Sequence, residues 1–256
     1  LKNNLNKKLI SLNKKWITYK KNFKFNKKGE LSLKIDNEEI NLDLYTNSIL
    51  RFTGPRSYMA SSNNNLFLMT GNGTLMFLEF DKIKKKNIKF KKIKTNLSEL
   101  LFPYQEKARL DKETMIVKNI MTKDNKLYVS YIKKIDNNCY KNSIVSGSIN
   151  KKKIIFSEFF ILPKCRPYFS NGSGGNLSNY KNNEILMTIG DWEMYEHIYY
   201  RKNPEEFLDV AQTIDNPLGK IIAINVDKKD YRILSMGHRN PQGLYYDKKD
   251  DLIFSA

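Results

Sequence analysis

The sequence is poor in histidine and cysteine and has no long hydrophobic run. It contains 2 histidines and 2 cysteines among 256 residues. His197 and His238 are widely spaced from each other and from the cysteines, so they form no recognisable zinc-binding pattern. No apolar run approaches the roughly 18 residues that a membrane-spanning helix needs. No serine or cysteine nucleophile motif occurs, and residues 71–73 predict a hairpin turn, not a phosphate loop, because no helical pattern follows them.

Acidic residues are outnumbered, with 27 Asp and Glu against 45 Lys and Arg, and the formal net charge is +18. Such an excess is typical of nucleic-acid-binding proteins. Lysine is accompanied here by many Asn and Ile residues, and all three have AT-rich codons. Genome composition therefore accounts for much of the excess of basic residues. The densest run, residues 82–94, partly alternates apolar and basic residues and predicts a half-exposed strand with a solvated basic face. We therefore expect no specific nucleic-acid binding, since a dedicated patch would need stacking aromatic residues nearby.

One pattern occurs four times along the chain: a polar turn of Asn, Asp, Lys or Glu residues, followed by a run of mostly apolar residues. The apolar part begins at Leu66, Leu127, Ile185 and Leu252, which are 61, 58 and 67 residues apart. Helical periodicity is almost absent. Propeller repeats run about 40 to 50 residues, so the spacing predicts β-propeller blades with enlarged loops, whose radial stacking buries both sheet faces. We expect an all-β propeller with about four blades, the last one incomplete, and the four positions in equivalent strands.

The organisation along the chain predicts two parts. Residues 1–43 are interpreted as an N-terminal strand or capping segment, with strand-like pieces at 16–19 and 31–35, and residues 44–256 as a partial propeller. The longest excursion between strands, residues 191–217, is rich in aromatic residues and either shapes a binding face or forms a packed structural loop. The chain begins at Leu1 and ends at Ala256 directly after a strand-like run, so both ends are interpreted as cut, and an export signal could lie upstream.

The two cysteines, Cys139 and Cys165, flank a predicted strand pair. They either form one disulfide in an oxidising compartment or remain two buried thiols. The spacing alone does not decide between these alternatives.

The most specific motif is GHRNPQGL at residues 237–244. Two pieces precede it: GGNL at 174–177 with ILMTIGD at 185–191, and AQ at 211–212 with GKIIAIN at 219–225. Over residues 165–256 this order resembles the glucose and sorbosone dehydrogenase family, whose members include soluble aldose sugar dehydrogenases that depend on pyrroloquinoline quinone (PQQ). The resemblance implies a six-bladed propeller that binds PQQ and calcium (Ca2+) and oxidises a hydroxyl of a sugar or another small molecule.

The resemblance also implies cofactor contacts for Arg239 and Asn240. Arginine offers a planar charged fork to carboxylates and quinone oxygens, and asparagine a neutral donor. The alternative is that this turn only builds a blade, with Pro241 fixing φ and His238 as a hydrogen-bonded structural imidazole. Calcium ligands are expected beyond Ala256. The family implies a periplasmic, extracellular or outer-surface membrane-anchored location, which is consistent with a Cys139–Cys165 disulfide.

One position departs from the family pattern. Active relatives carry a histidine two residues before the glycine pair, and this chain has Gly172 there, while Asn176 replaces the arginine of the pattern. That histidine is the family's general base, and glycine cannot accept a proton. The catalytic residue is therefore not assigned, with Asp191 and His197 as candidate substitutes. Two functions follow: a PQQ-dependent sugar dehydrogenase-like quinoprotein, or a non-catalytic propeller that binds a carbohydrate or protein partner.

Overall fold

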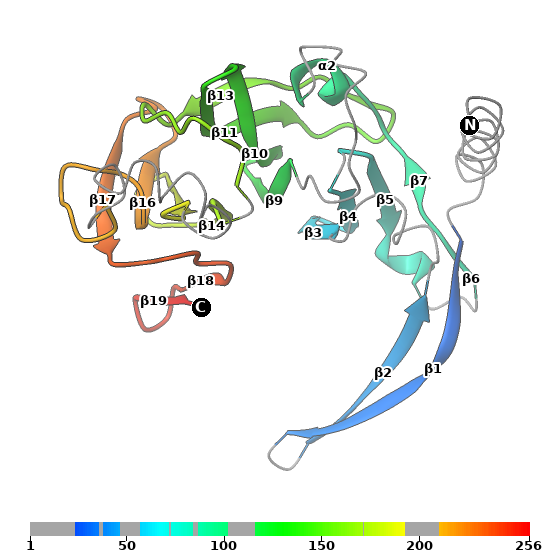
Figure 1. Cartoon of the computed structure of the whole chain (residues 1–256). Coiled ribbons are helices and arrows are strands. Elements are labelled where there is room, and N and C mark those ends of the chain that lie inside the picture. Colours follow the sequence, from blue (N-terminus) through cyan, green and yellow to red (C-terminus); the bar gives the residue numbers. More distant parts are fainter. Residues whose placement is uncertain are drawn as a thin grey trace, which may run out of the picture.

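The computed structural model describes residues 24–35, 38–46, 57–71, 73–83, 87–101, 116–170, 172–192 and 210–256. Within them, three four-stranded antiparallel sheets and one two-stranded sheet follow one another in an arc (Figure 1). The first sheet contains β3 (Ser57–Ser62), β4 (Asn65–Thr70), β5 (Leu75–Glu79) and β7 (Lys91–Lys92). The second contains β9 (Val117–Lys123), β10 (Lys126–Asp136), β11 (Cys139–Ser148) and β13 (Ser157–Ile161). The third contains β14 (Gly174–Asn179), β15 (Glu184–Ile189), β16 (Lys220–Asn225) and β17 (Tyr231–Met236), and the fourth β18 (Leu244–Asp247) and β19 (Leu252–Ser255).

The sheets are arranged radially as propeller blades. Strands within each sheet pair in sequence order. The first strand of the second blade, β9, contacts both β3 and β14, and β14 contacts β18, so the first strands lie together on the inner side of the arc (Figure 1). Leu66, Leu127, Ile185 and Leu252 lie in β4, β10, β15 and β19, the second strand of each sheet. The prediction of a β-propeller with equivalent strands is confirmed, with three complete four-stranded sheets and one partial sheet in the described chain.

The repeated polar turns join the first and second strands of each blade, and they adopt left-handed backbone conformations. Their positive φ angles, between 48° and 57°, occur at Asn63, Asp124, Asn125, Asn182, Asn183 and Asp251. Asparagine and aspartate adopt this conformation more readily than other residues with a Cβ, and tight hairpins require it. The Asn and Asp residues of the repeat are therefore explained by the left-handed backbone conformation that the turns require.

The hydrophobic core lies between blades because each central strand buries side chains on both faces. In β10, Leu127, Val129 and Tyr131 join the cluster between the first and second blades. The alternating positions Tyr128 and Ile132 join the cluster between the second and third blades. Successive side chains of a strand point to opposite faces, so a central strand in a stack of blades needs apolar residues at both.

The basic run at residues 82–94 is divided among several elements. It contains the end of a 3-10 helix, η2 (Phe80–Lys82), then β6 (Asn87–Lys89), β7 and the start of β8 (Lys94–Thr95), which pairs in parallel with β12 (Lys153–Ile154). Ile88, Phe90 and Ile93 are buried, whereas the intervening lysines are exposed. The predicted alternation of buried apolar and exposed basic residues is present. Three short strands occur in place of the single predicted strand, because Ile88 and Phe90 pack in one cluster and Ile93 in another.

The N-terminal hairpin consists of β1 (Lys24–Ile35) and β2 (Glu38–Thr46), with β6 paired on the other side of β1. It projects away from the blades (Figure 1). The expected strand piece at 31–35 lies in β1, whereas the one at 16–19 falls outside the described residues. The short helix α2 (Leu97–Leu101) follows β8 and packs against the cluster between the first and second blades. Among the described residues, no helix is long and apolar enough to cross a membrane.

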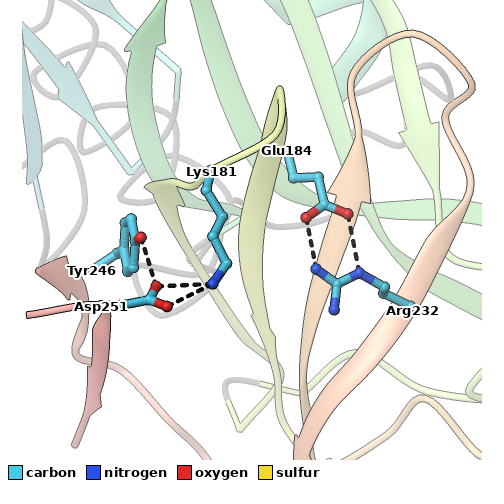
Figure 2. Close-up of polar contacts among 5 residues, drawn as sticks. All are labelled: Lys181, Glu184, Arg232, Tyr246 and Asp251. Carbon is cyan, nitrogen blue, oxygen red and sulfur yellow. Dashed lines mark hydrogen bonds and ion pairs between the residues drawn. The ribbon is translucent and has the colours of Figure 1, made fainter. Parts of the chain in front are cut away.

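Ion pairs brace the third blade and the fourth (Figure 2). Lys181 Nζ lies 2.8 and 2.9 Å from the carboxylate oxygens of Asp251, which also accepts a 2.8 Å hydrogen bond from the Tyr246 hydroxyl. The hydrogen bond from Lys181 lowers the pKa of Asp251. Within the third blade, Arg232 donates to both oxygens of Glu184, at 3.1 and 2.8 Å. The Lys181–Asp251 pair links the hairpin turns of the third and fourth blades. It adds little stability, because both side chains are exposed to solvent.

Candidate functional site

The predicted site residues come from three connections that lie on one face of the propeller. Residues 163–170 and 172–173 precede β14, residues 190–192 leave β15, and residues 237–243 connect β17 to β18. Since neighbouring strands of a blade are antiparallel, the start of a first strand and the ends of second and fourth strands meet at the same face. The polar hairpin turns lie at the opposite face. This topology brings Gly172, Asp191, Arg239 and Asn240 together, whereas His197 lies outside the described residues.

Hydrogen bonds tie the GHRNPQG loop to the other two connections. The backbone N–H of Asp191 donates to the carbonyl oxygen of Arg239 at 2.8 Å. The N–H of Gly174 donates to Asn240 Oδ1 at 3.2 Å. Asn240 therefore holds the start of β14 in place, a structural role that its amide performs whether or not a cofactor binds. The sequence contains no local signal for this contact, which spans 66 residues.

The side chain of Arg239 is exposed. Its guanidinium forms no hydrogen bond or ion pair with any residue that the structure describes. Its backbone is fixed while its charge remains accessible at this face. An accessible guanidinium on a fixed backbone suits the binding of a planar anion, because no existing ion pair has to break first.

Gly172 is buried, and its backbone is fixed on both sides. Its N–H donates to Ser170 Oγ at 3.0 Å, and its carbonyl oxygen accepts from the N–H of Trp192 at 3.2 Å. Gly190 packs directly against it, since a Cβ added at Gly190 would lie 2.0 Å from the Gly172 oxygen. The glycine at 190 thus permits the close approach of two backbone segments. Gly172, where the resemblance places the family's base, has no side chain that could accept a proton.

Asp191 is 3% exposed, and its backbone is hydrogen-bonded to two arginines. Its carbonyl oxygen accepts a 3.1 Å hydrogen bond from Nη2 of Arg166, and its backbone N–H donates to the carbonyl oxygen of Arg239. A general base must come within hydrogen-bond reach of the substrate hydroxyl. The burial of Asp191 favours a role in holding Arg239 over proton transfer from a bound sugar. Arg166 is also 3% exposed, and no motif in the sequence indicates that it belongs to this site.

Trp192 connects this face to the core. It is 1% exposed, and its φ of 70° is left-handed. Its indole Nε1 donates to Asn142 Oδ1 at 3.2 Å, and Asn142 Nδ2 donates to the carbonyl oxygen of Ser173 at 2.9 Å. Asn142 lies in β11 of the second blade, so this chain of contacts links two blades beneath Gly172. A left-handed tryptophan is unfavourable and persists only where surrounding contacts enforce it.

A disulfide joins Cys139 and Cys165, with a Cα–Cα distance of 5.0 Å and a sequence separation of 26. It connects the start of β11 to residues 163–173. Next to it, Tyr140 and Arg166 exchange backbone hydrogen bonds of 2.7 and 2.9 Å. The disulfide therefore fixes the segment that carries Arg166, and of the two alternatives for the cysteines the structure contains the disulfide.

Removal of this disulfide is expected to reduce the free energy of unfolding by about 2 to 4 kcal/mol, because the unfolded chain regains the freedom of the closed loop. The measurement compares urea unfolding of the wild type and the Cys139→Ser/Cys165→Ser protein under oxidising conditions. Reductant should lower the stability of the wild type to that of the variant and leave the variant unchanged. Equal stability of both proteins under oxidising conditions would contradict the expectation.

His238 is hydrogen-bonded, in line with a structural imidazole. Its backbone N–H donates to the carbonyl oxygen of Gly219 at 3.0 Å, and its ring Nε2 lies 2.8 Å from Ser235 Oγ. Burial lowers the pKa of His238, and the charge of Lys220 lowers it further. Both effects favour the neutral imidazole, which the hydrogen bond to Ser235 holds within the loop.

In the parts of the chain that the structure describes, no group of three or more His, Cys, Asp or Glu side chains could hold a metal ion. These residues therefore contain no acidic cluster of that size for the calcium that the resemblance implies, whose ligands are expected beyond Ala256.

The sequence profile of the family described as Glucose / Sorbosone dehydrogenase matches residues 113–256. The match covers more than half of the chain and includes the whole second blade, upstream of the motifs that begin near residue 165. The fold and the ordered motifs define a β-propeller of the sugar dehydrogenase type. The chain belongs to the glucose/sorbosone dehydrogenase family.

Solved structures show the same fold at low identity. A glucose dehydrogenase superposes with a TM-score of 0.55 at 16% identity, covering 79% of this chain and 62% of that one. A second crystal structure of a glucose dehydrogenase gives 0.56 at 15%, covering 80% and 57%. The soluble aldose sugar dehydrogenase from Escherichia coli, in its apo-form, gives 0.51 at 14%, covering 79% and 57%. This chain thus matches less than two thirds of the length of each. A comparison with curated protein sequences finds no match.

Proposed function

We propose that this chain forms part of a PQQ-dependent sugar dehydrogenase-like quinoprotein, which oxidises a hydroxyl of a sugar or alcohol. Family membership supports the class of reaction. The observation that carries the proposal is the exposed guanidinium of Arg239, which has no described side-chain partner and sits on a backbone fixed by Asp191. PQQ supplies the two-electron acceptor, and the protein contributes binding and orientation.

Arg239 is the proposed electrostatic contact to the cofactor. Its guanidinium presents a planar fork that fits carboxylates and adjacent quinone oxygens. Asn240 is the second proposed contact, through an amide whose oxygen also ties the loop to Gly174. Because that oxygen already has a structural partner, we expect Arg239 to contribute more of the binding energy than Asn240.

Replacement of Arg239 by alanine is expected to weaken PQQ binding by about 1.5 to 3 kcal/mol, the range for a hydrogen bond to a charged group. This corresponds to a rise in Kd of about 10- to 150-fold. The measurement is titration calorimetry of the full-length protein with PQQ in the presence of calcium. Lys248→Ala is the charge-matched control, since Lys248 is exposed in the hairpin turn at the opposite face and should leave the Kd unchanged. Equal losses in both variants would show that only net charge matters.

The position of Gly172 favours a second candidate, a non-catalytic propeller that binds a carbohydrate or a protein partner. The base position has no proton acceptor, and Asp191 is buried. Wild-type protein that binds no PQQ in the same titration but binds sugars would support this candidate and refute the dehydrogenase. For either candidate we propose a periplasmic, extracellular or outer-surface location, because structural disulfides persist in oxidising compartments.

A further inference from the structure

Lys220 is a completely buried lysine at the start of β16. Its Nζ donates to the carbonyl oxygens of Leu218, Val210 and Ala211 at 2.7, 2.9 and 2.9 Å. An ammonium has three donors, and all three are used here. Burial lowers the pKa of Lys220, whereas three carbonyl acceptors favour its charged form. The ammonium of Lys220 thus binds both ends of residues 210–218 through their carbonyl oxygens.

The segment that Lys220 gathers is also the support of the GHRNPQG loop. The carbonyl oxygen of Ala211 accepts a second hydrogen bond, from the N–H of Gly237 at 2.8 Å. The carbonyl oxygen of Gly219 accepts from the N–H of His238 at 3.0 Å. Gly219 has a φ of 68°, and a Cβ there would lie 2.7 Å from the His238 oxygen, so the two segments pack without space for a side chain. Two of the three residues GHR are therefore attached to the segment that surrounds Lys220.

We infer that Lys220 is a positioning residue for the cofactor contact: its ammonium holds residues 210–219, which hold Gly237 and His238, and thereby sets the place of Arg239. Without the ammonium, the carbonyl oxygens of Leu218, Val210 and Ala211 each lose one donor, and that of Ala211 keeps the Gly237 N–H. This loss is costly unless the segment moves to reach water. Movement of the segment releases the Gly237 and His238 amides. The effect on PQQ rests on the proposed function, whereas the effect on the loop does not.

The test compares Lys220→Met, which keeps a long apolar side chain but removes the charge, with Lys118→Met. Lys118 is a second buried lysine; it lies in β9 and donates to the carbonyl oxygen of Ser170, which lies outside the GHRNPQG loop. It therefore controls for the general loss of a buried lysine. Lys220→Gln, which retains a neutral donor, is the second variant and keeps the test available if Lys220→Met does not fold.

Amide hydrogen exchange of the full-length protein is the first readout. Exchange at Gly237 and His238 should become at least about tenfold faster in Lys220→Met, and less so in Lys220→Gln, while the amides of β10 stay unchanged. The Kd for PQQ should rise about tenfold in the same variant. Uniform acceleration across the propeller, or the same change at Gly237 and His238 in Lys118→Met, would overturn the inference. If the wild type binds no PQQ, the proposed function fails, and the exchange at Gly237 and His238 still decides the role of Lys220.

Discussion

Replacement of Trp192 by alanine is expected to lower the free energy of unfolding by about 3 to 5 kcal/mol, the usual cost of removing a buried aromatic side chain. The indole is 1% exposed and packs in the cluster between the second and third blades, with the ring of Tyr168 at 6.5 Å. Alanine also leaves Asn142 Oδ1 without the indole donor. Urea unfolding followed by circular dichroism measures the loss.

Two further variants separate the causes of that loss. Trp192→Phe keeps most of the buried area but removes the donor to Asn142, so an intermediate loss of about 1 to 3 kcal/mol is expected. Met59→Ala is the exposed control, since Met59 is 66% exposed, and should change stability by less than about 0.5 kcal/mol. A loss below 1 kcal/mol for Trp192→Ala would show that the indole does not join the two blades.

The propeller could be predicted because its signals are local. Each blade begins with a hairpin whose turn residues, such as Asn182 and Asn183, need left-handed conformations. The strands that follow carry their own apolar pattern, as in β15, which is buried along its whole length. The spacing of these units then indicates radial repetition. No long-range contact had to be known for any of these steps.

The supports of the candidate site could not be predicted, because they join residues that are distant in sequence and ordinary in type. Arg166 reaches the carbonyl of Asp191 across 25 residues, and Asn142 meets Trp192 across 50. Lys220 resembles a surface lysine at a strand end, and only the return of residues 210–218 over the blade buries it. For Asn240 the family resemblance indicated a ligand contact, while the bond to Gly174 appears only in the folded chain.

Oxidation of aldoses by the full-length protein, supplied with PQQ, calcium and an artificial electron acceptor, is expected to be about 10²- to 10⁴-fold slower than in relatives that carry histidine at the position of Gly172. A positioned base contributes a factor of this size. The structure strengthens the expectation, because the buried backbone of Gly172 is engaged by Ser170 and Trp192 and offers no acceptor for the hydroxyl proton. Turnover and PQQ affinity should therefore be separable, with binding retained and turnover slow.

Gly172→His tests the cause of slow turnover, and Gly172→Ala is its matched control, because both add a Cβ at the same buried position and only one adds an imidazole. A gain in turnover for histidine alone, with a new pH dependence near the pKa of an imidazole, is the expected result. The close packing of Gly190 against the Gly172 carbonyl limits how far the loop can move, so the gain should be partial. Fast aldose oxidation by the unmodified protein would refute the missing base. Asp191→Asn and His197→Gln would then identify the side chain that accepts the proton.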